Sequence, residues 1–131
     1  MRFLLDPNVL SELTLRVPNP FVRANIDRFA DDLALPSVSL HEILYGALRL
    51  PESRKRRAVF AQLDYIRATM PILPYDEPAA TWHASERSRL SQIGLMPAFA
   101  DGQIAAIAAT RELILVTNNL RDFQYFDGLA I

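Results

Sequence analysis

Short apolar runs alternate along the chain with longer stretches in which apolar residues recur every three or four positions. The runs are typical of buried strands, and the periodic stretches are typical of helices that pack one face against a core. The expected strands cover residues 1–5, 33–38, 71–75 and 113–117, with a last short strand at 128–131. The expected helices include 40–50, 52–70, 77–93 and 100–109, with a turn or short helix at 118–122. Strands and helices in this order predict an α/β fold with a mostly parallel sheet.

Four acidic residues lie where an expected strand ends or an expected helix begins. Asp6 follows the first apolar run, and Asp122 comes soon after the run at 113–117. Glu42 and Asp101 each fall in the first turn expected for a helix. In a parallel sheet these positions share one edge, because each crossover helix starts where a strand finishes. Open α/β sheets also bind their ligands at that edge.

Carboxylates gathered at one place repel each other strongly. Two of them about 4 Å apart repel by roughly 4 kcal/mol at an effective dielectric near 20, so a close cluster takes up protons or binds a cation. Oxygen ligands without Cys or clustered His favour Mg²⁺ or Mn²⁺. Such a site can activate water and stabilise the attacking and leaving oxygens of a phosphodiester. Asp6, Glu42, Asp101 and Asp122 are therefore candidate metal ligands and catalytic residues for phosphodiester hydrolysis.

Each acid also has a purely structural interpretation. Glu42 completes a capping box with Ser39, which alone could explain it. Asp6 could begin an Asx turn, Asp101 could complement a helix dipole, and Asp122 could be a solvated loop residue. Asp76 also lies between an expected strand and helix, and we assign it the structural role of N-cap for the helix at 77–93. The joint position of the other four, rather than any one of them, favours a functional site.

Composition limits the interpretation without naming a substrate. The chain has 131 residues, of which 50% are hydrophobic, so we expect residues 1–131 to form a single domain. The net charge of −1 gives no global attraction to nucleic acid, so any such binding must be local. The absence of cysteine fits a reducing compartment. The N-terminal apolar run is too short for a signal peptide, and no run is long enough to span a membrane, so we expect a cytoplasmic protein.

Five sequence blocks, in order and spread over the whole chain, resemble those of the PIN-domain ribonuclease toxins of the VapC and FitB type. The blocks are residues 6–12, 37–46, 74–80, 100–106 and 116–123. The resemblance implies an α/β/α three-layer sandwich, Mg²⁺- or Mn²⁺-dependent endoribonuclease activity, and a toxin held inactive by a cognate antitoxin. It also implies a homodimer, to which the helical hairpin at 40–70 contributes, and possible toxin–antitoxin hetero-oligomers.

The acids of this chain match the family's metal site position by position. Asp6, Glu42 and Asp101 match its three most regular acidic residues. The fourth acid stands at one of two places in relatives, occupied here by Asn119 and Asp122, and we choose Asp122. The family usually has Thr where this chain has Pro7, which supplies neither a hydroxyl nor a backbone N–H. Pro7 motivates the alternative of a catalytically weakened PIN domain that binds antitoxin or RNA without cleaving.

Other features carry weaker signals. The basic run at 54–57, with Arg49 shortly before it, could bind phosphates or could be a solvated helix face. His41, His83 and Trp82 have no partners at ligand spacing, and we interpret them as packing or surface residues. A phosphoacceptor receiver domain needs an acidic pair after the first strand, and a haloacid-dehalogenase-type phosphatase needs an Asp at position 8. This chain has neither feature.

Overall fold

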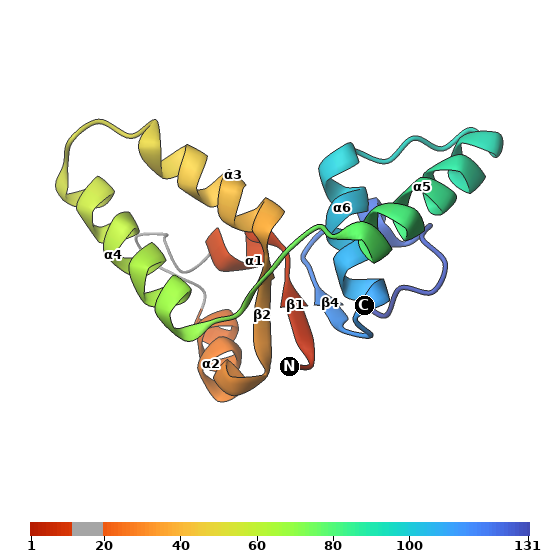
Figure 1. Cartoon of the computed structure of the whole chain (residues 1–131). Helices are drawn as coiled ribbons and strands as arrows, with labels where there is room; N and C mark the ends of the chain where they lie inside the picture. The colour runs from red at the N-terminus through yellow and green to blue at the C-terminus, as the bar shows by residue number, and fades with distance from the viewer. Residues whose placement is uncertain (12–19) are drawn as a thin grey trace.

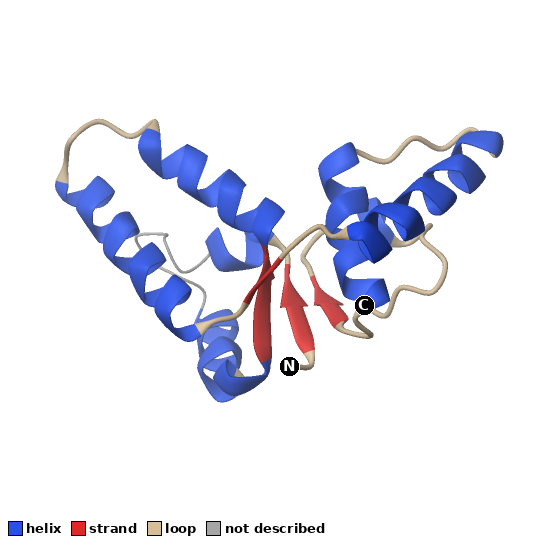
Figure 2. Cartoon of the chain, viewed as in Figure 1, coloured by secondary structure: helices blue, strands red, loops and turns tan. Residues whose placement is uncertain are grey.

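A parallel sheet forms the centre of the computed structural model, which describes residues 1–11 and 20–131. Within these residues the sheet has four strands in the order β3-β2-β1-β4, and every pair of neighbours is parallel. The strands are β1 (Phe3–Leu5), β2 (Leu33–Pro36), β3 (Ile72–Leu73) and β4 (Ile114–Val116). Their C-terminal ends point toward the same edge (Figures 1 and 2). The predicted parallel sheet is confirmed, although each strand is shorter than its apolar run.

Helices connect the strands, and those that directly follow β1 and β2 begin at the C-terminal edge of the sheet. They are α1 (Pro7–Ser11), α2 (Pro20–Arg28), the 3₁₀ helix η2 (Ala30–Asp32), α3 (Ser37–Leu48), α4 (Arg54–Thr69), α5 (Glu77–Gln92), α6 (Phe99–Thr110) and α7 (Leu120–Phe123). Within the described residues, none of these helices combines the length and the apolar character needed to cross a bilayer.

Alternating side chains of the strands feed two separate cores. Leu4, Ala34 and Leu115 lie in one core with the buried residues of α5 and α6. Leu5 and Leu35 point to the opposite face, into a core that includes residues of α1 and α4. This alternation is the period of two expected of a pleated strand. The helices therefore cover both faces of the sheet, and the predicted three-layer α/β/α sandwich is confirmed (Figure 2).

The helices α3 and α4 form a hairpin that projects from the sheet (Figure 1). A small apolar cluster of Ala47, Val59 and Leu63 holds the two helices together. The side chain of Ser53 caps α4 by accepting a hydrogen bond from the backbone N–H of Arg56 at 3.1 Å. The helical hairpin expected at 40–50 and 52–70 is confirmed.

Polar pairs anchor α5 to its neighbours. Asp76 accepts a hydrogen bond from the backbone N–H of Ala79 at 3.2 Å, which confirms it as the N-cap of α5. The same carboxylate pairs with Arg111 at the end of α6, at 3.0 Å. Two turns into α5, His83 is buried and its Nδ1 is hydrogen-bonded to the hydroxyl of Tyr75 at 2.8 Å. His83 thus has a packing role, as expected.

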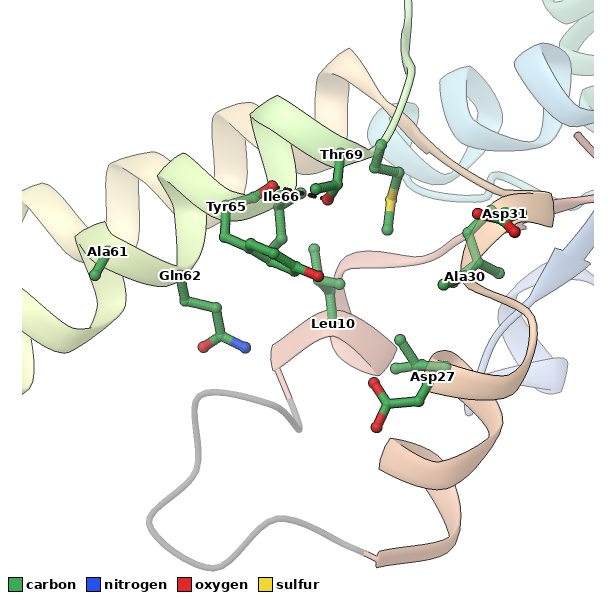
Figure 3. Close-up of a pocket in the computed structure, with 12 residues that line it drawn as sticks. Leu10, Asp27, Ala30, Asp31, Ala61, Gln62, Tyr65, Ile66 and Thr69 are labelled. Atoms are coloured by element: carbon green, nitrogen blue, oxygen red, sulfur yellow. Dashed lines mark hydrogen bonds between the residues drawn. The ribbon is translucent and has the colours of Figure 1, made fainter.

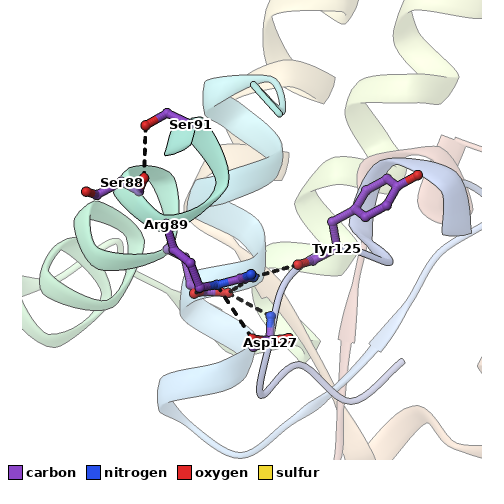
Figure 4. A network of polar contacts seen from close by, with 6 residues as sticks. Ser88, Arg89, Ser91, Tyr125 and Asp127 are labelled. Carbon is purple, nitrogen blue, oxygen red and sulfur yellow. Dashed lines mark hydrogen bonds and ion pairs between the residues drawn. The ribbon is translucent and has the colours of Figure 1, made fainter. Parts of the chain in front are cut away.

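A buried carboxylate, Glu86, ties the C-terminal segment to α5. Arg89 donates to both oxygens of Glu86, at 2.8 and 3.0 Å, and to the carbonyl of Tyr125 at 2.8 Å (Figure 4). The backbone N–H of Asp127 also donates to Glu86, at 2.7 Å. These hydrogen bonds, that of Arg89 first, hold the pKa of Glu86 below its usual value despite burial.

The last predicted strand, at 128–131, is wrong. Residues 128–131 form no strand; the backbone N–H of Leu115 donates to the carbonyl of Ala130 at 2.8 Å, and Leu129 packs against the core that includes Leu4 and Leu115. Gly128 has a positive φ of 76°, which breaks an extended conformation and favours glycine. The apolar residues at 129–131 thus lie close to the sheet without pairing with it as a strand.

Candidate functional site: a carboxylate cluster at the sheet edge

The four candidate acids come from four different elements around the C-terminal edge of the sheet. Asp6 follows β1 and is only 3% exposed. Asp101 lies in the first turn of α6 and is partly buried, and Asp122 lies in the first turn of α7 and is exposed. Glu42 is exposed on α3. Two central positions thus hold sheltered carboxylates, and two flanking positions hold solvated ones.

Glu42 does not lie where local reasoning placed it. The helix α3 begins at Ser37, with Pro36 as the N-cap residue, so its first turn contains no acid. Ser39 is already inside the helix and cannot cap it. The predicted capping box of Ser39 and Glu42 is therefore wrong. The buried hydroxyl of Ser39 has no hydrogen-bond partner among the described residues. Pro36 is extended and makes no side-chain cap, and the helix begins directly after it. Its fixed φ is compatible with this N-cap position.

The acids influence one another electrostatically. The pKa of Asp101 is raised to about 6, first by burial and then by the charges of Asp122, Asp6 and Glu42. Burial also raises the pKa of Asp6, and the charge of Asp122 adds to the effect. All four acids therefore belong to one electrostatic cluster, as their topology predicted. Among the described residues, no three of these acids are close enough together to hold one metal ion.

Asp6 is held by a residue that the sequence reasoning did not select. The hydroxyl of Thr117 donates to Asp6 Oδ2 at 2.6 Å, and the backbone N–H of Asn119 donates to Thr117 Oγ1 at 2.9 Å. The N–H of Asn119 occupies an acceptor site on the hydroxyl, which leaves the hydroxyl proton for Asp6. Hydrogen bonds from Thr117 and from the backbone of Asn8 lower the pKa of Asp6 and so partly offset its burial.

A signal for Thr117 was present in the strand pattern. Leu5 of β1 pairs with Val116 of β4, so the next residue on each strand, Asp6 and Thr117, also lie side by side. A polar residue directly after a neighbouring parallel strand is thus a candidate partner for the first acid. The missing knowledge was that β1 and β4 are neighbours, which no local pattern states.

The two candidates for the fourth position differ in what they offer. Asp122 adds its charge to the environment of both Asp6 and Asp101. Asn119 is exposed and orients Thr117 through its backbone N–H. The charge of Asp122 thus acts on two of the other acids, while Asn119 contacts the first acid indirectly through Thr117, and the choice of Asp122 for the fourth position stays a prediction. Glu12, in the first sequence block, lies outside the described residues.

The cluster lies away from a large hollow in the protein. That hollow, of about 630 Å³, lies between α2 and α4, and Figure 3 shows Leu10, Asp27, Gln62, Tyr65 and Ile66 around it. None of the four acids lines it. The carboxylates lie instead at the C-terminal edge of the sheet, where Glu42 and Asp122 are exposed to solvent.

Known proteins are similar to this chain along almost its whole length. A family model described as PIN domain matches residues 3–129. The tRNA(fMet)-specific endonuclease VapC of Shigella flexneri is 31% identical, and the match covers 98% of this chain and 95% of the relative. The crystal structure of FitAcB from Neisseria gonorrhoeae has a TM-score of 0.89 at 33% identity and covers 98% and 94% of the two chains. A member of the VapBC family of toxin-antitoxin systems from Mycobacterium tuberculosis has a TM-score of 0.71 at 28% identity, with 98% and 93% coverage.

Proposed function

This chain belongs to the PIN-domain family, among relatives of the VapC and FitB type, and we propose that it is a metal-dependent endoribonuclease that acts in the cytoplasm as the toxin of a toxin-antitoxin pair. The alternative is a weakened PIN domain that binds antitoxin or RNA without cleaving. The observation that supports cleavage is the electrostatic cluster of Asp6, Glu42, Asp101 and Asp122 at the sheet edge.

The donor set fits a hard divalent cation. Four carboxylates with oxygen donors, and no thiol in the chain, favour Mg²⁺ or Mn²⁺. Burial, and after it the charges of the other three acids, raise the pKa of Asp101, and a bound cation would favour its ionised form. Asp6, Asp101 and Asp122 would hold the ion, with Glu42 reaching in from α3. The ion would supply an activated water and charge stabilisation for phosphodiester hydrolysis.

The chain's own residues divide the remaining work. Thr117 keeps one oxygen of Asp6 in a fixed direction, which is how hydrogen-bonded neighbours orient metal ligands. The first turn of α6 fixes Asp101, and the positive end of that helix favours its ionised form. Glu42 and Asp122 are exposed and can adjust to an arriving phosphate.

The Thr117 contact also bears on the alternative function. Pro7 lacks the hydroxyl usual in the family, yet Asp6 already accepts a hydrogen bond from the Thr117 hydroxyl. The departure at position 7 therefore leaves Asp6 oriented, which favours the cleaving form. A Pro7→Thr variant that cleaved far faster than wild type would instead support the weakened form.

An antitoxin partner and self-association complete the proposal. The structural relative from M. tuberculosis is named as part of a toxin-antitoxin system. We propose a cognate antitoxin for this chain on that basis, together with a homodimer. Co-expression of an adjacent small gene should relieve any growth arrest that this chain causes.

The test is an RNA cleavage assay with purified protein. Wild type should cut single-stranded RNA with Mg²⁺ or Mn²⁺ and not in excess EDTA, and Asp101→Asn should reduce the rate by about 10³-fold or more, since metal-assisted charge stabilisation is worth several kcal/mol. Asp64→Asn is the matched control, because Asp64 is exposed on α4, outside the cluster. Circular dichroism should show that both variants are folded. Undiminished cleavage by folded Asp101→Asn, or cleavage in EDTA, would refute the assignment.

A further inference from the structure

Ser39 is a fully buried serine whose hydroxyl has no hydrogen-bond partner among the described residues. A serine inside a helix often donates to the carbonyl four positions earlier. For Ser39 that carbonyl belongs to Leu35, which lies in β2 rather than in the helix. The free backbone groups in the first turn of a helix are N–H donors, which cannot accept from a hydroxyl. The proton of the Ser39 hydroxyl therefore needs an acceptor on another side chain.

Ser39 lies between the two cores of the protein, just beyond the C-terminal end of β2. Val38 packs against the core that contains residues of α6, and Leu40 packs against the core on the other face of the sheet. Successive residues of a helix turn by about 100°, so Ser39 points between these two directions. Its complete burial shows that this direction faces the protein. The carboxylate cluster lies at the same edge of the sheet.

Glu42 is the acid closest to Ser39 along the chain. It follows Ser39 by three positions, so the two side chains are neighbours on one side of α3. The carboxylate of Glu42 is exposed, and the ion pairs among the described residues do not include it. Its charge still reaches Asp101 on α6, whose pKa is raised first by burial and in part by Glu42. Glu42 thus combines an available acceptor beside Ser39 with a place in the cluster.

Asp6 shows how this protein orients a carboxylate of the cluster. The Thr117 hydroxyl donates to Asp6 Oδ2 at 2.6 Å, and Thr117 is itself fixed by the backbone N–H of Asn119. Glu42 has a longer side chain and is exposed, so fixing its carboxylate costs more conformational entropy. The charges of the other acids also oppose an inward position of Glu42. A hydroxyl donor beside Glu42 would offset part of both costs.

We infer that Ser39 is the positioning residue for Glu42, and that its hydroxyl donates to the Glu42 carboxylate when this acid turns toward a divalent cation in the cluster. The hydrogen bond directs one carboxylate oxygen and leaves the other for the cation. Hydrogen-bonded neighbours of this kind orient metal ligands and strengthen metal binding. Ser39 would thus do for Glu42 what Thr117 does for Asp6. This inference rests on the proposed function, because it concerns the cation that the proposed nuclease would hold.

A serine with a purely structural role would respond differently to its removal. If the hydroxyl of Ser39 stabilised the fold through a backbone carbonyl, Ser39→Ala would lower stability and leave metal binding unchanged. A buried hydroxyl without an acceptor is unfavourable, so its replacement by a methyl group is neutral or stabilising. A positioning role for Glu42 therefore predicts unchanged or higher stability in EDTA together with weaker metal binding.

The test measures Mn²⁺ binding without RNA, by electron paramagnetic resonance of the free ion, and urea unfolding in EDTA. Ser39→Ala should weaken Mn²⁺ binding about tenfold, as for other residues that orient a metal ligand, while its urea midpoint stays level or rises. Ser39→Thr keeps the hydroxyl and should retain the affinity, even if its extra methyl group lowers the midpoint. Ser37→Ala is the matched control, because Ser37 lies in the same turn but about 200° around the helix, and it should leave the affinity unchanged.

A double-variant cycle tests the link between the two residues. In a Glu42→Ala background, Ser39→Ala should cause no further loss of Mn²⁺ affinity, because it acts only through Glu42. Equal affinity of Ser39→Ala and wild type, or a loss that persists in Glu42→Ala, would overturn the inference while leaving the proposed function intact. If wild type binds no Mn²⁺, both fail. If the affinities behave as described but wild type never cleaves RNA, the proposed function fails and the role of Ser39 stands.

Discussion

The two helical pairs beside the sheet are held together in different ways. The pair α5 and α6 is joined by directional contacts, which include Asp76 with Arg111 and the buried ring of His83 against that of Phe99. The hairpin of α3 and α4 depends on a small apolar cluster and leaves most of its charges in solvent. Asp101 belongs to the first pair and Glu42 to the second. The two sides of the site thus differ in how rigidly they are held, by directional contacts on one side and by apolar packing on the other.

A methyl group added to a helix on each side should have opposite effects. In Gly102→Ala the new Cβ would overlap the ring of His83, which Tyr75 and Phe99 hold in place. We expect a loss of about 2–3 kcal/mol in the free energy of unfolding, as for other overpacked cores. In Gly46→Ala on α3 the new Cβ meets nothing within 4 Å, and we expect a gain of about 0.5–1 kcal/mol.

Urea unfolding measures both changes. Adding His83→Ala to Gly102→Ala should make the double variant less destabilised than the sum of the two single changes, by about 1 kcal/mol. Additive losses, or a neutral Gly102→Ala, would show that α6 is free to move and that the comparison between the two sides is mistaken.

The junction between the sides should respond to pH. The folded-state pKa of Asp101 is about 6, above its ordinary value of 3.8, so the folded protein holds the extra proton between these pH values. The unfolding free energy in EDTA should therefore fall as pH rises through this window and stay level above it. Asp101→Asn removes the unfavourable charge and should be more stable than wild type above pH 6. We expect a gain of only about 1 kcal/mol, because solvent screening reduces the effect for a partly exposed carboxyl.

The advantage of Asp101→Asn should vanish near pH 4 and also diminish when Mg²⁺ is added to wild type at pH 7. Urea midpoints at pH 4, 5 and 7.5 provide the measurement. If the difference in unfolding free energy between the two proteins did not depend on pH, the pKa of Asp101 would not be raised in the folded protein.

The smallest effect concerns the hairpin. Lys55→Glu places an acid in the first turn of α4 and should stabilise the protein by about 0.5 kcal/mol through the helix dipole. Arg67→Glu, in the last turn of the same helix, should destabilise it by a similar amount. Thermal unfolding resolves the pair as shifts of opposite sign. If both shifts had the same sign, the dipole would not explain the stability of this helix.

Local patterns were sufficient for most elements of the fold. The apolar runs at 33–38 and 113–117 both contain a strand, and the N-cap Asp76 marked the start of α5 correctly. Such features depend on neighbours within a few residues, which a single sequence contains. The parallel sheet then followed from the alternation of strands and helices.

The errors arose where tertiary contacts decide. The pattern around Ser39 and Glu42 satisfied the rule for a capping box, but β2 ends at Pro36 and the helix starts earlier. The partnership of Asp6 and Thr117 joins residues 111 positions apart and depends on which strands are neighbours. The positions of all four acids at one edge could be predicted because topology alone determines an edge. Their catalytic roles remain a prediction.

The two borders of the sheet have a consequence for the protein before it meets any partner. β3 is two residues long and lies between Pro71 and Pro74, which cannot donate backbone hydrogen bonds. On the other border, Ala130 accepts the N–H of Leu115 in β4. Short, proline-flanked or covered edges resist pairing with strands of other molecules. We therefore expect the almost wholly apolar core strands of this chain to be shielded from fibrous self-assembly.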